Sequence, residues 1–170
     1  MTRNLDSQKL YEKWERKVTQ DTEAKMCNEN IVINQTEKKA KCDDWETIYK
    51  NDIPGQTGID LKLKKGNSII VIEAKGGRVS QKNAKSRIEM ALGAIIMDME
   101  KENSDKSYYY CLAFPATEAF KKCEIPSRAR QQLGLNIIFV DCSTGLLKII
   151  RSDRKDMTDF SSFDELLHIN

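Results

Sequence analysis

The stretch "GIDLKLKKGNSIIVIEAKGG", residues 58–77, decides how this chain folds and where its chemistry lies. Two apolar segments, 59–65 and 68–75, are separated by Gly66 and Asn67, a pair favoured in two-residue hairpin loops. The second segment is apolar at successive positions, as in a strand buried on both faces, until its last residues. The stretch therefore predicts a β-hairpin whose second strand lies inside a sheet and carries charged residues at its end.

The turn also predicts which residues face each other across the hairpin. With a two-residue loop, Lys65 pairs with Ser68, and counting outward from that pair places Asp60 opposite Glu73. Side chains that face each other on neighbouring strands have Cβ atoms about 5 Å apart. Lys75 lies two residues beyond Glu73 and so projects to the same face of the sheet. A three-residue loop would give Asp60 a different partner.

Two carboxylates directly opposite each other destabilise a sheet unless something compensates their charge. A divalent cation such as Mg²⁺ suits this role, because it binds a few carboxylate oxygens and retains several waters. A lysine beside the cation, here Lys75, could stabilise negative charge on a phosphate or orient an attacking water. The other interpretation is that Asp60, Lys62, Glu73 and Lys75 form solvated ion pairs on an exposed face.

The spacing of Asp60 from Glu73-Ala74-Lys75 resembles the D…(D/E)xK signature of the PD-(D/E)XK nucleases, which share the restriction-endonuclease-like fold. The segment "CLAFPATEAFKKCEIPSRARQQLGLNIIFVD", residues 111–141, is similar to the second half of such proteins. The proline that gives the motif its name is absent, since Ile59 precedes Asp60. The resemblance covers most of the chain and implies an α/β fold with an αβββαβ core, in which helices flank a mixed central sheet.

The resemblance also implies a role for each residue of the motif. Asp60 and Glu73 would be ligands of Mg²⁺ together with the backbone carbonyl of Ala74, and Mn²⁺ would substitute for Mg²⁺. Lys75 would be the catalytic lysine. The implied activity is metal-dependent hydrolysis of DNA phosphodiester bonds in restriction, repair or recombination. A duplex target favours a homodimer, because one active site cuts one strand, and a protein partner could supply targeting.

Members of this family often take a further acid from the first helix. That helix is predicted over residues 7–27, and its candidates are Glu12, Glu15 and Glu23. Glu15 lies at the edge of the apolar stripe of this helix, whereas Glu12 and Glu23 point away from it. We expect Glu15 to be a third acid near the metal, with a solvated glutamate at a boundary position as the alternative.

Basic and polar residues follow the motif at the start of the next predicted helix: Arg78, Gln81, Lys82, Lys85 and Arg87. A helix N-terminus already favours phosphate, and added cations near a metal make a plausible surface for contacts to a nucleic-acid backbone. These five residues are therefore expected to contact nucleic acid. The alternative is an ordinary polar start of a helix.

Periodicity and turn residues predict helices separated by strands, with a hairpin-rich first half. The predicted helices span 7–27, 80–101 with Ser80 as N-cap, 117–134 with an interruption at Pro126, and 162–168. The predicted strands span 31–34, 59–65, 68–75, 107–116, 135–141 and 145–151, with a further short strand around 45–49.

The composition limits the classes of function. The 170 residues have the length of one domain, so we expect a single nuclease-like domain over residues 1–170. Net charge is only +2 although 32% of residues are charged, so any basic surface is local. Five scattered cysteines and one histidine, His168, argue against structural zinc and against imidazole catalysis. The odd cysteine count, with no signal peptide and no membrane-length apolar run, predicts a cytoplasmic, reducing setting without a membrane.

Two rival functions stay open beside a Mg²⁺-dependent DNA endonuclease. The first is a non-catalytic DNA-binding or assembly module of the same fold, against which the intact set of Asp60, Glu73 and Lys75 argues. The second is a small α/β interaction domain whose charges form a surface ladder. Sequence specificity, preferred DNA structure and pathway do not follow from these residues.

Overall fold

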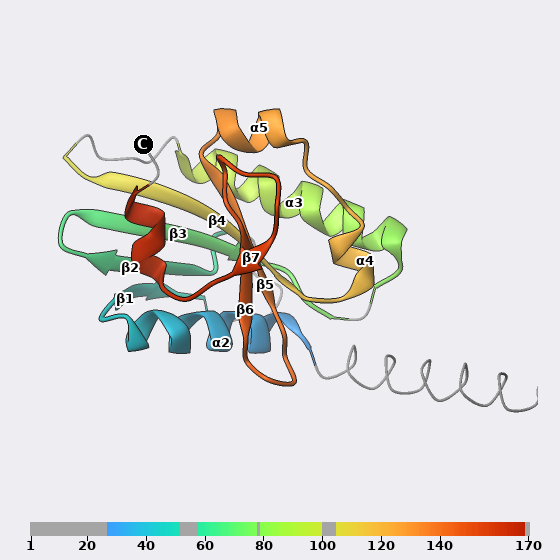
Figure 1. The fold of residues 1–170 in the computed structure, drawn as a ribbon, viewed down its shortest axis with the longest axis horizontal. Helices are drawn as coiled ribbons and strands as arrows, with labels where there is room; N and C mark the ends of the chain where they lie inside the picture. The colour runs from blue at the N-terminus through green and yellow to red at the C-terminus, as the bar shows by residue number, and fades with distance from the viewer. Residues whose placement is uncertain (1–26, 52–57, 78, 100–104, 169–170) are drawn as a thin grey trace, which may run out of the picture.

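The computed structural model describes residues 27–51, 58–77, 79–99 and 105–168 (Figure 1). Its centre is a mixed seven-stranded sheet in which the strands follow one another in chain order, β1 to β7. The long helices α2 (Glu29–Cys42) and α3 (Gln81–Met99) cover opposite faces of this sheet (Figure 1). Each helix packs on its own hydrophobic core, so the molecule has three layers, helix on sheet on helix. The α/β fold with a mixed sheet between helices is as predicted.

The hairpin at the centre of the fold has the predicted register. Strand β2 (Leu61–Lys65) pairs antiparallel with β3 (Ser68–Ala74), and Lys65 lies opposite Ser68. Gly66 at the turn has φ of 59°, a left-handed conformation that glycine adopts without steric cost. The two-residue loop is therefore confirmed, and with it the alignment of every pair along the hairpin.

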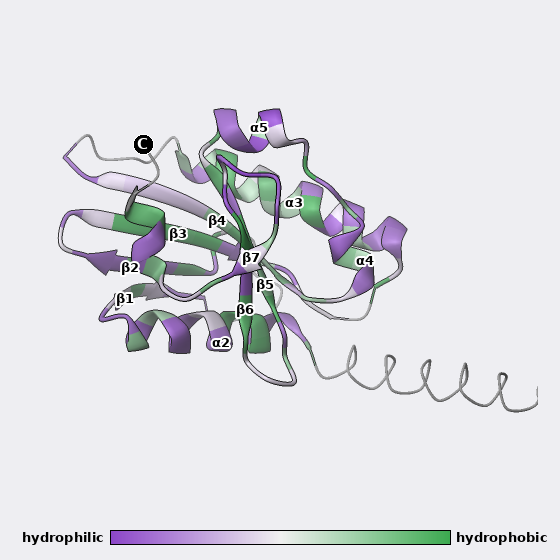
Figure 2. Cartoon of the chain, in the orientation of Figure 1, coloured by the Kyte–Doolittle hydropathy of each residue, from purple (hydrophilic) through white to green (hydrophobic). Residues whose placement is uncertain are grey.

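Strand β3 is buried on both faces, which explains its continuous apolar run (Figure 2). Ile70 and Ile72 belong to the core beneath α2, whereas Ile69 and Val71 belong to the core beneath α3. This alternation follows from the period of two residues in a strand. The only charged residue within β3 is Glu73, which lies next to its last residue and is itself buried.

The predicted strand over residues 31–34 is wrong, because this segment lies in helix α2. The Asn28 side chain caps the helix by accepting a hydrogen bond from the Ile31 backbone N–H, at 3.0 Å. The buried residues of α2 recur at helical spacing: Val32, Ile33, Thr36, Glu37 and Ala40. The β-branched residues at 31–33 favour a strand locally, but burial of a longer helical face outweighs that preference.

The first strand of the sheet is instead β1 (Glu46–Lys50), which the sequence predicted as the further short strand. It pairs antiparallel with β2 at the edge of the sheet. The order α2–β1–β2–β3–α3–β4 is therefore αβββαβ, as expected, although its first helix and first strand are not the ones predicted. The predicted helix over 7–27 lies outside the described residues.

The second half of the chain completes the sheet. Strands β4 (Ser107–Pro115) and β5 (Leu135–Val140) extend it in parallel with β3, and β6 (Leu147–Ile150) and β7 (Thr158–Asp159) add antiparallel strands. The predicted helical region before β5 forms two short helices, α4 (Glu118–Lys121) and α5 (Ser127–Gln132), with Pro126 between them. A 3₁₀ helix, η1 (Phe163–His168), follows β7.

Two further features bear on the cysteines and on membranes. Cys27 and Cys142 are joined by a disulfide, whereas Cys42, Cys111 and Cys123 are free. The pairing was not predicted from the sequence, because Cys27 and Cys142 are 115 positions apart and meet only in the folded chain. Helices of membrane-crossing length and apolarity do not occur in the part of the chain that the structure describes.

Candidate metal and phosphate site

Asp60 and Glu73 meet where β2 begins and β3 ends. Leu61 pairs with Ile72, so the next positions outward, Asp60 and Glu73, face each other. The Asp60 backbone N–H donates to the carbonyl of Ile72 at 3.2 Å. Its carboxylate Oδ2 accepts the Ala74 backbone N–H at 2.7 Å. Both acids are only 2% exposed, so the two carboxyl groups are held in the protein interior and not on a solvated surface.

Lys75 brings a positive charge to these two acids. Its Nζ lies 2.5 Å from Glu73 Oε1 and 3.8 Å from Asp60 Oδ2. The same ammonium donates to the Ala74 carbonyl at 2.8 Å. The backbone N–H of Lys75 donates to Ala113 of β4 at 3.0 Å, which fixes the end of β3 against its parallel neighbour. The structure thus brings together the three side chains that the sequence motif singled out.

A fourth charged residue, Glu29, reaches the same lysine from the first turn of α2. Its Oε2 lies 3.6 Å from Lys75 Nζ, and its side chain is 34% exposed. Glu29 was not among the acids expected from the sequence, because residues 31–34 were predicted to form a strand. The signal that could have found it is Asn28, a good N-cap, followed by an acid and a helical apolar pattern. Glu15, the acid chosen from the sequence, lies outside the described residues.

Gly76 explains why the start of α2 can come so close to the site. A Cβ atom at Gly76 would lie 2.3 Å from the backbone nitrogen of Glu29 and 2.5 Å from the carbonyl carbon of Asn28. Only glycine allows this approach. The space beside Gly76 is therefore filled by the backbone of α2 and is not open to a ligand.

Burial sets the protonation of the acids. Burial is the largest influence on Glu73 and raises its pKa to about 8; the charge of Asp60 adds to this, and the hydrogen bond from Lys75 opposes it. The pKa of Glu29 is also raised, first by burial and less by Asp60. Burial alone would lower the pKa of Lys75, but Glu73, Asp60 and Glu29 together raise it. Lys75 is therefore charged at neutral pH, while Glu73 holds a proton.

The donor set fits a small, hard cation. Glu73 Oε2 is buried without a hydrogen-bond partner, and a buried oxygen of this kind is available to a ligand. The neighbouring carbonyl of Ala74 and the carboxylate of Asp60 complete a set of oxygen ligands, which Mg²⁺ and Mn²⁺ prefer. A group of three or more acidic, histidine or cysteine side chains placed for a metal does not occur among the described residues, so water would supply the remaining ligands.

The predicted contacts to nucleic acid divide into two groups. Gln81, Lys82 and Lys85 are exposed on the first turns of α3, where Ser80 Oγ accepts the Asn83 N–H as the expected N-cap. Arg87 differs, because its guanidinium donates to the carbonyl of Gly76 and so supports the loop beside the site. Arg78 lies outside the described residues.

Comparison with known proteins shows similarity to solved structures and assigns no family. No family model matches the chain, and no curated protein matches it. A solved structure of an XisH family protein from Nostoc punctiforme is 14% identical. It aligns over 69% of this chain and 95% of its own length, with a TM-score of 0.47. Function is therefore inferred from the chemistry of the site.

Proposed function

We propose that this protein is a metal-dependent endodeoxyribonuclease that hydrolyses phosphodiester bonds. The observation that carries the proposal is the convergence of Asp60, Glu73 and Lys75 at the end of β3, with one carboxylate oxygen buried and unpartnered. Two acids, a backbone carbonyl and a lysine are the groups that metal-assisted hydrolysis of a phosphodiester requires. The residues Asp60, Glu73 and the Ala74 carbonyl would hold Mg²⁺ or Mn²⁺.

The bound cation would activate a water and polarise the phosphate. Lys75 has its ammonium between the oxygens of Glu73 and Ala74, from where it can turn toward a phosphate and stabilise charge that develops there. Glu73 has to release its proton to bind the cation, so metal affinity rises with pH. Glu29 Oε2 lies 3.6 Å from the Lys75 ammonium, so its carboxylate adds to the negative charge that keeps the lysine at the site and protonated.

The surrounding surface supports contact with DNA. Gln81, Lys82 and Lys85 project from the start of α3, the helix that leaves the site, and can bind backbone phosphates. Arg78 is proposed as a further contact on its sequence position alone. We also propose a homodimer for duplex targets, a protein partner for targeting and an intracellular location, where DNA is found.

A second candidate is the non-catalytic module of the same fold. The observation that favours it is the self-contained charge balance, in which Lys75 offsets the charge of Asp60 and Glu73 is protonated, without a metal. In such a protein the cluster would stabilise the end of β3 and nothing more. Metal binding distinguishes the two candidates, because a balanced structural cluster has no affinity for Mn²⁺.

The deciding experiment is a cleavage assay on supercoiled plasmid, branched DNA and single strands with Mg²⁺, Mn²⁺ or EDTA. We expect cutting that requires a metal and falls about 10²–10³-fold in Lys75→Ala. Lys155→Ala is the matched control, because it removes the same charge at an exposed position and should cut like wild type. Calorimetric titration with Mn²⁺ accompanies the assay. Absence of both cutting and Mn²⁺ binding in wild type would replace the nuclease with the non-catalytic module.

A further inference from the structure

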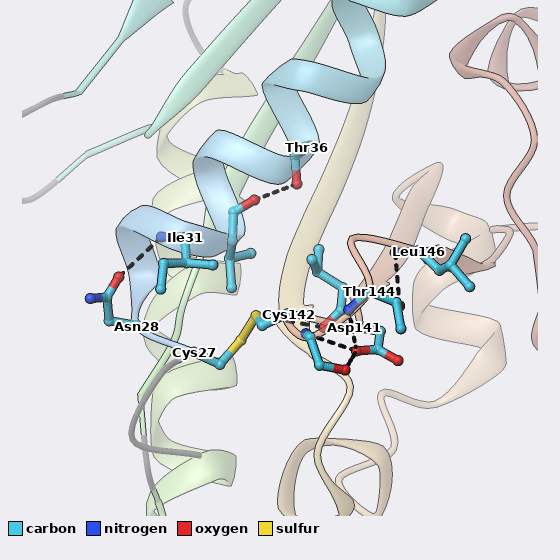
Figure 3. The surroundings of a disulfide bond; sticks show 11 residues. Cys27, Asn28, Ile31, Thr36, Asp141, Cys142, Thr144 and Leu146 are labelled. Atoms are coloured by element: carbon cyan, nitrogen blue, oxygen red, sulfur yellow. Dashed lines mark hydrogen bonds between the residues drawn. A yellow bond between two sulfur atoms is a disulfide. The ribbon is translucent and has the colours of Figure 1, made fainter. Parts of the chain in front are cut away.

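The Cys27–Cys142 disulfide joins two parts of the chain that support the proposed site (Figure 3). Cys27 directly precedes Asn28, the N-cap of α2, and Cys142 lies in the turn between β5 and β6. The Cα atoms are 5.6 Å apart, within the range that a disulfide spans without backbone movement. The bond therefore ties the start of α2 to the turn that follows β5, at the edge of the sheet where the parallel strands β3, β4 and β5 end.

On the Cys27 side, the bond adjoins the candidate metal site. The carbonyl of Cys27 accepts the Gly77 N–H at 2.7 Å, and the next two residues pack their backbone on Gly76. Glu29 follows two positions after Cys27 and lies 3.6 Å from Lys75. The position of Cys27 thus determines how closely Glu29 approaches the lysine.

On the Cys142 side, hydrogen bonds within the turn at residues 141–145 hold its backbone in place (Figure 3). Asp141 Oδ1 accepts the backbone N–H of Ser143 at 2.9 Å and that of Thr144 at 3.2 Å. The Ser143 hydroxyl donates to the same oxygen at 2.6 Å, and the Gly145 N–H donates to the Asp141 carbonyl at 2.7 Å. A bond to this turn holds Cys27 against a structure that is fixed by its own hydrogen bonds.

The disulfide is also accessible to a small reagent. Both cysteines line a cavity of about 610 Å³ beyond the ends of β4 and β5, together with Lys121 and Lys148. Cys27 is 3% exposed, whereas Cys142 is partly exposed. Attack on the Cys142 sulfur is therefore the open route, and two lysines beside it suit an anionic thiol.

We propose that Cys27 and Cys142 form a redox-modification site for low-molecular-weight thiols, and that its state sets the position of Glu29 against Lys75. A thiolate attacks Cys142 Sγ, which forms a mixed disulfide and releases Cys27 as a thiolate. A second thiolate attacks the external sulfur of that mixed disulfide and releases Cys142 as a thiolate. The protein gains two electrons and two protons, and the two reagent thiols leave as one disulfide; the reverse reaction consumes that disulfide. The consequence for catalysis rests on the proposed nuclease function.

The structural part is tested on the wild-type protein in glutathione disulfide and in reduced glutathione, first by alkylation and mass analysis. We expect three alkylated cysteines after oxidation, namely Cys42, Cys111 and Cys123, and five after reduction. Amide exchange at Ile31 and Gly77 should be about tenfold faster in the reduced form, while Ala84 of α3 is unchanged. Five free thiols in the oxidising buffer, or equal exchange in both states, would overturn the proposal.

The catalytic part uses the cleavage assay in the same two buffers. We expect cleavage to be about tenfold slower in the reduced protein, because Glu29 would position the Lys75 ammonium less closely. Cys142→Ser should behave as reduced in both buffers, whereas Cys42→Ser, a control at an exposed free cysteine, should respond like wild type. Equal rates in both states would refute the link to Glu29. If wild type never cuts, the nuclease proposal fails, and amide exchange alone decides the redox site.

Discussion

The pKa values of two buried glutamates, Glu37 and Glu73, are shifted in opposite directions. Glu37 of α2 accepts hydrogen bonds from Thr47 at 2.9 Å and from Lys50 at 2.8 Å, and Lys41 Nζ lies 2.8 Å from its carboxylate. Burial raises the pKa of Glu37, but the three donors outweigh it and lower that pKa to about 2. Glu73 has one lysine, which it shares with Asp60 and Ala74, and its pKa is about 8.

The difference shows how a structural ion cluster is told apart from a candidate site. Both carboxylate oxygens of Glu37 have donors, so the protein stabilises the ionised form and no oxygen is left for a cation. Glu73 keeps one buried oxygen without a partner, and its charged form is disfavoured until a cation arrives. Local sequence does not separate them, since both glutamates lie among lysines and apolar residues.

Exchanging each glutamate for glutamine gives the largest contrast. At pH 7 without metal, Glu37→Gln should lower the free energy of unfolding by about 2–3 kcal/mol, because two lysines lose a charged acceptor. Glu73→Gln should instead raise that free energy, by up to about 3 kcal/mol, because wild-type Glu73 has to take up a proton on folding and glutamine does not. Urea unfolding measures both.

Titration with Mn²⁺ completes that contrast: Glu37→Gln should bind like wild type, and Glu73→Gln should lose binding. If Glu73→Gln destabilises as strongly as Glu37→Gln, the two clusters are of the same kind and Glu73 is structural.

Two glycine substitutions test whether α2 is held closely against the site. Gly76 is where α2 packs on the site, and Gly93 of α3 is the control in open space. Gly76→Ala should cost about 1–3 kcal/mol and move Glu29 away from Lys75, because the new methyl group meets backbone at 2.3 Å. Gly93→Ala, on the open surface of α3, should stabilise the protein by about 0.5–1 kcal/mol through helix propensity. Thermal and urea unfolding report both values. A neutral Gly76→Ala variant would show that α2 is not held against the site.

The free energy of unfolding should depend on pH in opposite ways for the two glutamates. The folded pKa of Glu73, about 8, exceeds its ordinary value of 4.5, so the folded state holds a proton that the unfolded chain has released. Stability should therefore fall as pH rises from about 4.5 to about 8. For Glu37 the folded pKa is the lower one, so stability should fall as pH drops from about 4.5 toward 2.

The urea concentration at the midpoint of unfolding, measured over this pH range, checks both expected directions. Glu73→Gln should flatten the alkaline side only, and Glu37→Gln should flatten the acidic side only. Saturating Mg²⁺ should also remove the alkaline loss in wild type, because it binds the ionised acid. An alkaline loss that Glu73→Gln leaves intact would assign it to another group.

Much of the site follows from the sequence, because the hairpin is local. A two-residue turn and a period of two residues place Asp60, Glu73 and Lys75 on one face without reference to the rest of the chain. Burial of β3 on both faces is visible in its unbroken apolar run. The segment 31–34 was misjudged, because β-branched residues favour strands locally and the burial of α2 that overrides them is a tertiary effect.

The sequence by itself determined the hairpin register and the charged residues at the end of β3. Only the tertiary structure decided that Glu29 reaches Lys75, that Gly76 is needed for α2, and that Cys27 meets Cys142. These contacts join residues more than 40 positions apart, and no local pattern encodes them. The protonation of Glu73 belongs with them, because it depends on how many donors the folded chain brings to a buried oxygen.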